Sequence, residues 1–185
     1  MREITVKIYK FNELDAKVQE KVINEMTRFI QEMDAPTFLD DITDAWREKL
    51  TELGYENPEI LYSGFGSQGD GASFTSDNIK EASGIKELID QLSEEERAEI
   101  SIRLRRIDSR YYHENTVTVD AEGLDSALMA QKLEIDAHEV IKKLSREIYK
   151  ELETAYDGLS SRENVIDFID ENDYEFFADG RTYSE

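Results

Sequence analysis

Alternating apolar and polar positions predict a strand at the start of the chain and a hairpin near its middle. Ile4, Val6 and Ile8 alternate with polar or aromatic side chains, which is the period of a half-buried strand. The same alternation recurs from Ile100 to Leu104 and from Tyr112 to Asp120. These two segments are typical of an antiparallel hairpin. Further short strands are expected at residues 59–65 and 174–177.

Apolar residues spaced three and four apart predict several helices. Asn12 and Asp15 form a weak capping arrangement before a helix that should end near Asp34, and a second helix should follow Pro36 and stop at Gly54. Further helices are predicted over residues 85–92, after a capping pair of Ser93 and Glu96, over residues 137–159, and after a capping pair of Ser160 and Glu163. Residues 122–135 give no clear pattern.

Together these elements predict an α+β fold, with helices packed on a small, mostly antiparallel β-sheet. A length of 185 residues fits one domain, so residues 1–185 are interpreted as a single acidic domain. The 8 Phe, 9 Tyr and 1 Trp are placed periodically, which argues against disorder. The longest apolar run, residues 127–130, is far shorter than the roughly 20 residues of a membrane-spanning helix. With a charged N-terminus in place of a signal peptide, we expect a cytoplasmic protein with no membrane partner.

The net charge limits the kinds of molecule that the chain can bind. The chain carries 43 acidic and 22 basic residues, a formal net charge of −21, so it should attract cationic proteins and repel nucleic acid. It has no cysteine, which excludes thiol catalysis, disulfides and cysteine metal sites. The two histidines, His113 and His138, have no His or Cys at metal-ligand spacing. We therefore expect no metal, no cofactor and no catalytic residue.

On the second predicted helix, acidic residues recur at every fourth position. Asp40, Asp44, Glu48 and Glu52 follow one another at steps of about 6 Å, because a helix rises about 1.5 Å per residue, and Asp41 lies beside them. This spacing is similar to that of successive phosphates along a nucleic-acid strand, so the stripe is interpreted as a phosphate mimic. The alternative is the solvated face of an amphipathic helix. Repulsion of roughly 0.2–0.5 kcal/mol per like-charged pair weighs against that alternative.

The C-terminal segment is also strongly anionic. Residues 157–185 hold nine acidic residues and two arginines. Asp167, Asp170, Glu171 and Asp173 are close together in sequence and form a second candidate contact for a cationic groove. A solvated acidic tail is the simpler alternative. Charge repulsion of this size lowers stability, which hints that the charge has a use.

A glycine-rich segment after the strand predicted at 59–65 is a candidate ligand loop. Its glycines stand at positions 64, 66, 69 and 71, which matches neither a P-loop nor a dinucleotide-binding motif. Backbone amides in such a loop can bind an anion. The polar residues Gln68, Asp70 and Ser73 are expected to be exposed there, and Ser67 could add a hydroxyl to the anion site. The alternative is a tight structural turn.

The predicted hairpin holds a basic cluster. Alternation places Arg103 and Arg105 on one face, and Tyr111, Tyr112 and His113 follow nearby. Arginine and aromatic side chains together can bind a nucleotide by charge and stacking. The alternative is that these arginines neutralise carboxylates of the chain itself, of which there are many.

Four segments, Tyr9–Leu14, Gly64–Phe74, Tyr112–Thr116 and Asn172–Gly180, follow one another in an order that resembles a group of small phage and prophage proteins of unassigned function. The resemblance covers most of the chain. It gives no reaction. It implies a phage or mobile-element setting, in which small acidic proteins are often inhibitors of host defence nucleases.

We therefore expect a phage-encoded acidic inhibitor of a CRISPR effector or restriction enzyme, in the cytoplasm of a host bacterial cell. Its carboxylates would occupy the basic surface that the nuclease uses for nucleic acid, and no direct nucleic-acid binding is expected. One alternative is a ligand-binding or enzymatic module that uses loop 67–73 with Arg103, Arg105 and His113 to bind a phosphorylated small molecule. Another is a protein that pairs with a second copy or a phage component through an edge strand. The oligomeric state stays open.

Overall fold

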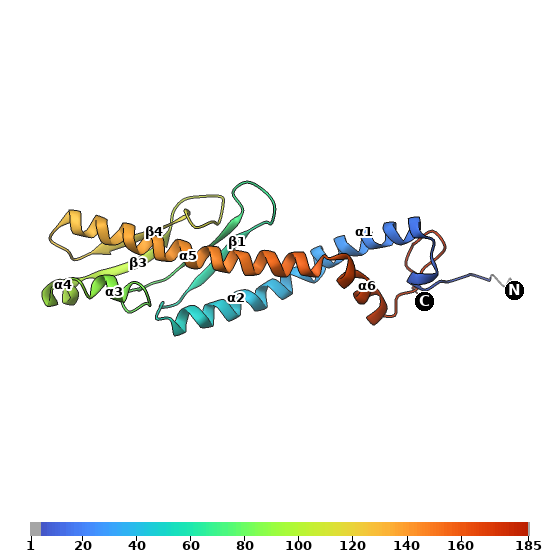
Figure 1. Ribbon diagram of the computed structural model, residues 1–185, viewed down its shortest axis with the longest axis horizontal. Helices are drawn as coiled ribbons and strands as arrows, with labels where there is room; N and C mark the ends of the chain where they lie inside the picture. The colour runs from blue at the N-terminus through green and yellow to red at the C-terminus, as the bar shows by residue number, and fades with distance from the viewer. Residues whose placement is uncertain (1–4, 185) are drawn as a thin grey trace. The chain divides into compact units, whose positions relative to one another are not determined.

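The structure, a computed structural model, describes residues 5–184 and confirms the α+β fold (Figure 1). Contacts divide the chain into two compact units, one formed by residues 1–39 and 154–185 and the other by residues 40–153. The interpretation of residues 1–185 as one domain stays a prediction.

In the first unit, helices α1 (Ala16–Met33) and α6 (Arg162–Glu171) follow capping residues that differ from the predicted ones. The side chain of Asp15 accepts the first amides of α1, whereas Asn12 lies in the preceding 3₁₀ turn η1 (Phe11–Glu13). Ser161 caps α6, one residue after the predicted Ser160. Both shifts have the same cause, because the residue whose side chain reaches the free amides of the first turn is the one that caps the helix. The predicted end of α1 at Asp34 is confirmed.

The core of the first unit joins both ends of the chain. Its buried apolar side chains come from η1, α1, α6 and the C-terminal segment. They are Phe11, Leu14, Val22, Ile23, Met26, Ile30, Val165, Ile169 and Phe176. Burying this surface is the main force that closes the unit.

The strand predicted at residues 4–8 does not form over residues 5–8, and Ile4 lies outside the described residues. Only Tyr9 pairs, by two backbone hydrogen bonds of 2.8 and 2.9 Å with Phe176, which also bridges to Thr182. The strand predicted at 174–177 is therefore reduced to isolated bridges. Val6 and Ile8 are 50% and 40% exposed, so their alternation faces no core.

The second unit contains two antiparallel hairpins. β1 (Glu59–Ser63) pairs with β2 (Gly71–Thr75), and β3 (Ser101–Arg106) pairs with β4 (Val117–Glu122), which confirms the predicted central hairpin. Backbone hydrogen bonds between Ser76 and Leu104 join the two hairpins. The prediction that the glycine-rich loop extends through Ser73 is wrong at its C-terminal end, because residues 71–75 form strand β2.

Helices surround the hairpins of the second unit. They are α2 (Ala35–Glu52), α3 (Lys86–Ile89), α4 (Glu94–Glu99) and α5 (Ala127–Leu159), and the capping box of Ser93 and Glu96 is confirmed at α4. The β3–β4 hairpin lies beside the N-terminal half of α5 in Figure 1, where the backbone amide of Ala121 donates to Glu134. The loop of the β1–β2 hairpin contacts α5 farther along, where the hydroxyl of Tyr149 donates to the carbonyl of Gly64. None of the helices within residues 5–184 has the length and apolar character needed to cross a bilayer.

Candidate functional site

The carboxylates of α2 are all exposed, and most of them lack a cationic neighbour. Asp40, Asp44, Glu48 and Glu52 lie on the solvent side of the helix. Asp44 pairs with Arg47 on the next turn. Within residues 5–184, Asp40, Glu48 and Glu52 form no ion pair. The four-residue spacing expected from the sequence is therefore present as a row of largely unneutralised charge.

The opposite face of α2 fixes this row in place. Trp46 and Leu50 are buried, and the indole Nε1 of Trp46 donates to Glu151 on α5 at 2.9 Å. The ammonium group of Lys49 lies 3.6 Å from the centre of the Trp46 ring. Lys49 is thus engaged with the indole. A buried anchor of this kind holds the exposed carboxylates on a rigid element.

The C-terminal carboxylates are exposed but partly neutralised. Lys10 lies 2.7 Å from Asp173 and 3.3 Å from Glu175, and the hydrogen bond with Asp173 is the main reason that the pKa of Lys10 is raised. In the described part of the chain, Asp167, Asp170 and Glu171 have no cationic partner. They belong to the first unit, whereas the α2 row belongs to the second.

The glycine-rich loop binds a carboxylate of its own. The amide of Ser67 donates to Asp70 Oδ2 at 2.6 Å, and a Cβ built on Gly64 would lie 2.6 Å from Asp70 Oδ1. Asp70 therefore already occupies the Ser67 amide, which a bound anion would otherwise accept from. Gln68 is exposed, as expected, whereas Asp70 is half-buried; Ser67 is also exposed.

Ser73 is fully buried in β2, so the expectation that it is exposed is wrong. The hydroxyl of Thr116 lies 3.3 Å from that of Ser73, and His113 packs against Gly71, where a Cβ would come within 2.5 Å of the His113 Cβ. The fold thus brings His113 to the loop, as the ligand-binding alternative requires. It does so by close packing of backbone and side chains.

The two hairpin arginines face carboxylates on the neighbouring strand. Arg105 lies 3.4 Å from Asp120, and Arg103 lies 4.0 Å from Glu122. The register sets Arg103 directly opposite Asp120 in the β3–β4 ladder. These contacts agree with the interpretation that the arginines neutralise the chain's own charge.

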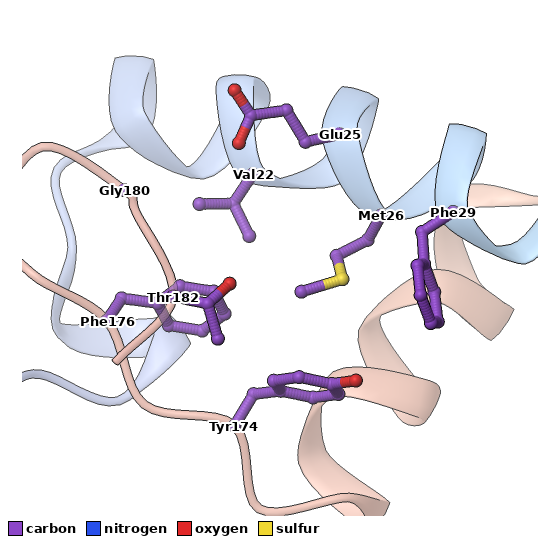
Figure 2. Close-up of a pocket in the computed structure, with 8 residues that line it drawn as sticks. All are labelled: Val22, Glu25, Met26, Phe29, Tyr174, Phe176, Gly180 and Thr182. Carbon is purple, nitrogen blue, oxygen red and sulfur yellow. The ribbon is translucent and has the colours of Figure 1, made fainter. Parts of the chain in front are cut away.

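A pocket in the first unit was not expected from the sequence (Figure 2). It has a volume of about 240 Å³ and lies between α1 and the segment 174–182. Val22 and Met26 form one side, Tyr174 lies across from them, and Glu25 stands at the edge beyond Val22. Helical spacing shows Val22 and Met26 only as core residues, and Tyr174 lies far away in sequence, so no local pattern marks the pocket.

No three His, Asp or Glu side chains gather to hold a metal ion anywhere in residues 5–184. The model of a family described as a domain of unknown function, DUF8835, matches residues 38–162. No curated protein and no solved structure matches the chain. The family match covers the α2 row and both hairpins and leaves most of the first unit outside.

Proposed function

We propose that this chain, which belongs to the DUF8835 family, is a non-enzymatic inhibitor that presents the α2 carboxylates to the basic nucleic-acid-binding surface of a host defence nuclease. The observation that carries the proposal is the row on α2. Asp40, Glu48 and Glu52 are exposed and without an ion pair among the described residues, on a helix anchored by Trp46.

The geometry of the row supports mimicry of a phosphate backbone. Steps of four residues along a helix correspond to about 6 Å, and neighbouring carboxylates lie on nearly the same side because four residues make slightly more than one turn of about 3.6 residues. A basic surface built to contact successive phosphates presents cations that such a row can meet one after another. Charge-assisted hydrogen bonds to arginine and lysine would then hold the complex.

The net charge supports fast capture of such a surface. A net charge of −21 attracts a basic protein over distance and raises the association rate. The same charge repels nucleic acid, so the inhibitor would compete with the nuclease's substrate without binding to it. The resemblance to phage and prophage proteins favours a CRISPR effector or a restriction enzyme, met in the host cytoplasm, as the target.

A panel of purified CRISPR effectors and restriction enzymes tests the proposal. We expect at least one enzyme to lose DNA cleavage when this protein is added, and excess DNA substrate to restore cleavage, since both compete for one surface. Gel-shift assays with the same DNA and this protein alone should show no complex. Inhibition that excess DNA does not reverse, or an effect on none of the enzymes, would contradict the proposal.

A further inference from the structure

We propose that the pocket between α1 and the segment 174–182 receives an arginine side chain of the basic partner. The inference rests on the proposed function, because it names a side chain that the partner would contribute. It concerns the first unit, whereas the α2 row lies in the second.

The walls of the pocket suit the stem and the head of an arginine. Val22 and Met26 are buried on α1 and offer methyl groups, and Figure 2 shows the ring of Tyr174 across from them with its face toward the pocket. Arginine packs its methylene stem on apolar surface and stacks its flat guanidinium on an aromatic face. The hydroxyl of Thr182 points into the same space and can accept a hydrogen bond.

The aromatic face belongs to a continuous row. Ring centres lie 6.2 Å apart from Phe29 to Phe168, 5.9 Å from Phe168 to Tyr174, and 6.4 Å from Tyr174 to Phe176. Neighbouring rings fix the orientation of Tyr174, so its face is already in position before a ligand arrives. A preorganised aromatic surface attracts a cation, and arginine is the commoner partner in such contacts.

Charge favours a cationic guest over an uncharged one. Glu25 stands at the rim, and its only ion pair in the described residues is with Lys21 at 3.8 Å, where both side chains are about half exposed. An exposed pair of this kind is weak, so an incoming guanidinium can replace Lys21. The sequence of this unit, residues 1–39 and 154–185, holds 16 acidic and 8 basic residues.

A methyl signal inside the pocket provides a direct test. The chain has four methionines, and labelling their methyl carbons for NMR gives Met26 a signal that Met26→Leu identifies. The probes are N-acetyl-arginine amide and N-acetyl-citrulline amide, which have nearly the same shape but differ in charge. We expect the arginine probe to shift the Met26 signal saturably, with an affinity at least about threefold higher than that of the citrulline probe. The signals of Met33 and Met129 should stay in place.

A matched pair of variants separates the rim carboxylate from general charge. Glu25→Gln should lower the affinity of the arginine probe to that of the citrulline probe. Glu32→Gln removes an equal charge from an exposed position on the same helix, outside the pocket lining, and should leave the affinity within about twofold. Circular-dichroism spectra and melting temperatures equal to those of the natural chain would show that both variants are folded.

Equal shifts with both probes, or equal losses in both variants, would overturn the inference. Because the free probe needs no nuclease, these outcomes do not depend on the proposed function. Conversely, if no enzyme of the nuclease panel is inhibited, the proposed function is wrong. The Met26 titration would still report on the pocket. With an inhibited enzyme in hand, Glu25→Gln should weaken binding by more than Glu32→Gln, and equal effects would show that the partner does not use the pocket.

Discussion

The α2 row and the β3–β4 hairpin both carry many charged side chains. In the hairpin these side chains pair with one another, whereas in the row they are largely unpaired. On the hairpin, Arg103 and Arg105 face Glu122 and Asp120 at 4.0 and 3.4 Å, so cations and anions meet within one element. On α2, the ion pair of Asp44 with Arg47 is the one that the row forms with residues 5–184. The difference indicates that a charged segment in a sequence is a stronger candidate for a binding surface where the fold leaves its charges without partners.

Paired and unpaired exposed charges should therefore contribute differently to binding. Exposed charges that already pair contribute less to a new contact, because the old pair must break first, and this cost is smaller for a weaker pair. Unpaired carboxylates on a rigid helix have no such cost and repel one another until a cation arrives. The comparison therefore favours α2 over the hairpin as the binding surface of the proposed function.

The largest expected effect comes from removing the charges of the row. Asp40→Asn, Asp44→Asn, Glu48→Gln and Glu52→Gln together should weaken binding to an inhibited nuclease by roughly 100-fold or more, at about 1 kcal/mol per charged contact. Calorimetry measures the affinity. The variant should be at least as stable as the natural chain, because repulsion between turns is relieved.

A variant with the same loss of charge sharpens this result. Glu59→Gln, Glu87→Gln, Glu99→Gln and Glu147→Gln remove four exposed carboxylates from the same unit. Binding should fall less than tenfold, from the weaker long-range attraction alone. A loss as large as that of the row variant would show that net charge, and no particular face, makes the contact.

The next largest effect is the loss of stability expected from adding a side chain at Gly71, where the glycine-rich loop packs against His113. Gly71→Ala should destabilise the protein by about 1–3 kcal/mol, because its Cβ would lie 2.5 Å from the His113 Cβ. Gly158→Ala, where nothing lies within 4 Å of the new Cβ, should instead raise helix stability by about 0.5–1 kcal/mol. Urea denaturation measures both. An unchanged stability for Gly71→Ala would mean that His113 leaves open space at the loop.

A smaller effect is expected at the hairpin itself. Arg105→Gln should lower the free energy of unfolding by roughly 0.2–1 kcal/mol, since both members of the pair with Asp120 are partly exposed. Affinity for the nuclease should not fall. A marked loss of affinity would place this arginine in the contact and reverse the comparison between the hairpin and α2.

The smallest effect is a pH dependence of one internal pair. The hydrogen bond from Lys142 lowers the pKa of Glu139. A lowered pKa adds stability above the unfolded value of about 4.3, and this contribution disappears as the pH falls through the folded value. The difference in melting temperature between the natural chain and Glu139→Gln should therefore shrink between pH 6 and pH 3. A difference that stays constant would show that the pair does not act in the folded state.

Regular periodicity made much of the fold predictable. The central hairpin alternates and α5 has a stripe that includes Ala137, Ile141 and Ile148, so the sequence predicts both elements. Their starts differ from the prediction: α5 begins at Ala127, ten residues before the predicted 137, and β4 begins at Val117, whereas the prediction began at Tyr112. The strand expected at residues 4–8 failed because alternation alone supplies no partner strand. β2 was missed because glycine and serine within it look like a turn, although Ser73 is buried, pairs with Leu61 in β1 and contacts the hydroxyl of Thr116.

The features of the candidate site also differ in whether one segment of the sequence is enough to predict them. Helical spacing alone identifies the exposed α2 row, because positions and exposure follow from one element. The pairing of Asp173 with Lys10, the filling of the loop by Asp70, and the pocket near Tyr174 depend on segments that meet only in three dimensions. No pattern within a single segment contains that information.

The salt dependence of binding between this protein and an inhibited nuclease tests the central claim most directly. If the unpaired α2 carboxylates form the contact, the logarithm of the affinity should fall steeply as sodium chloride rises from about 50 to 300 mM, and the row variant should show a clearly shallower slope. An affinity that does not change over this range, or equal slopes for the two proteins, would contradict the account.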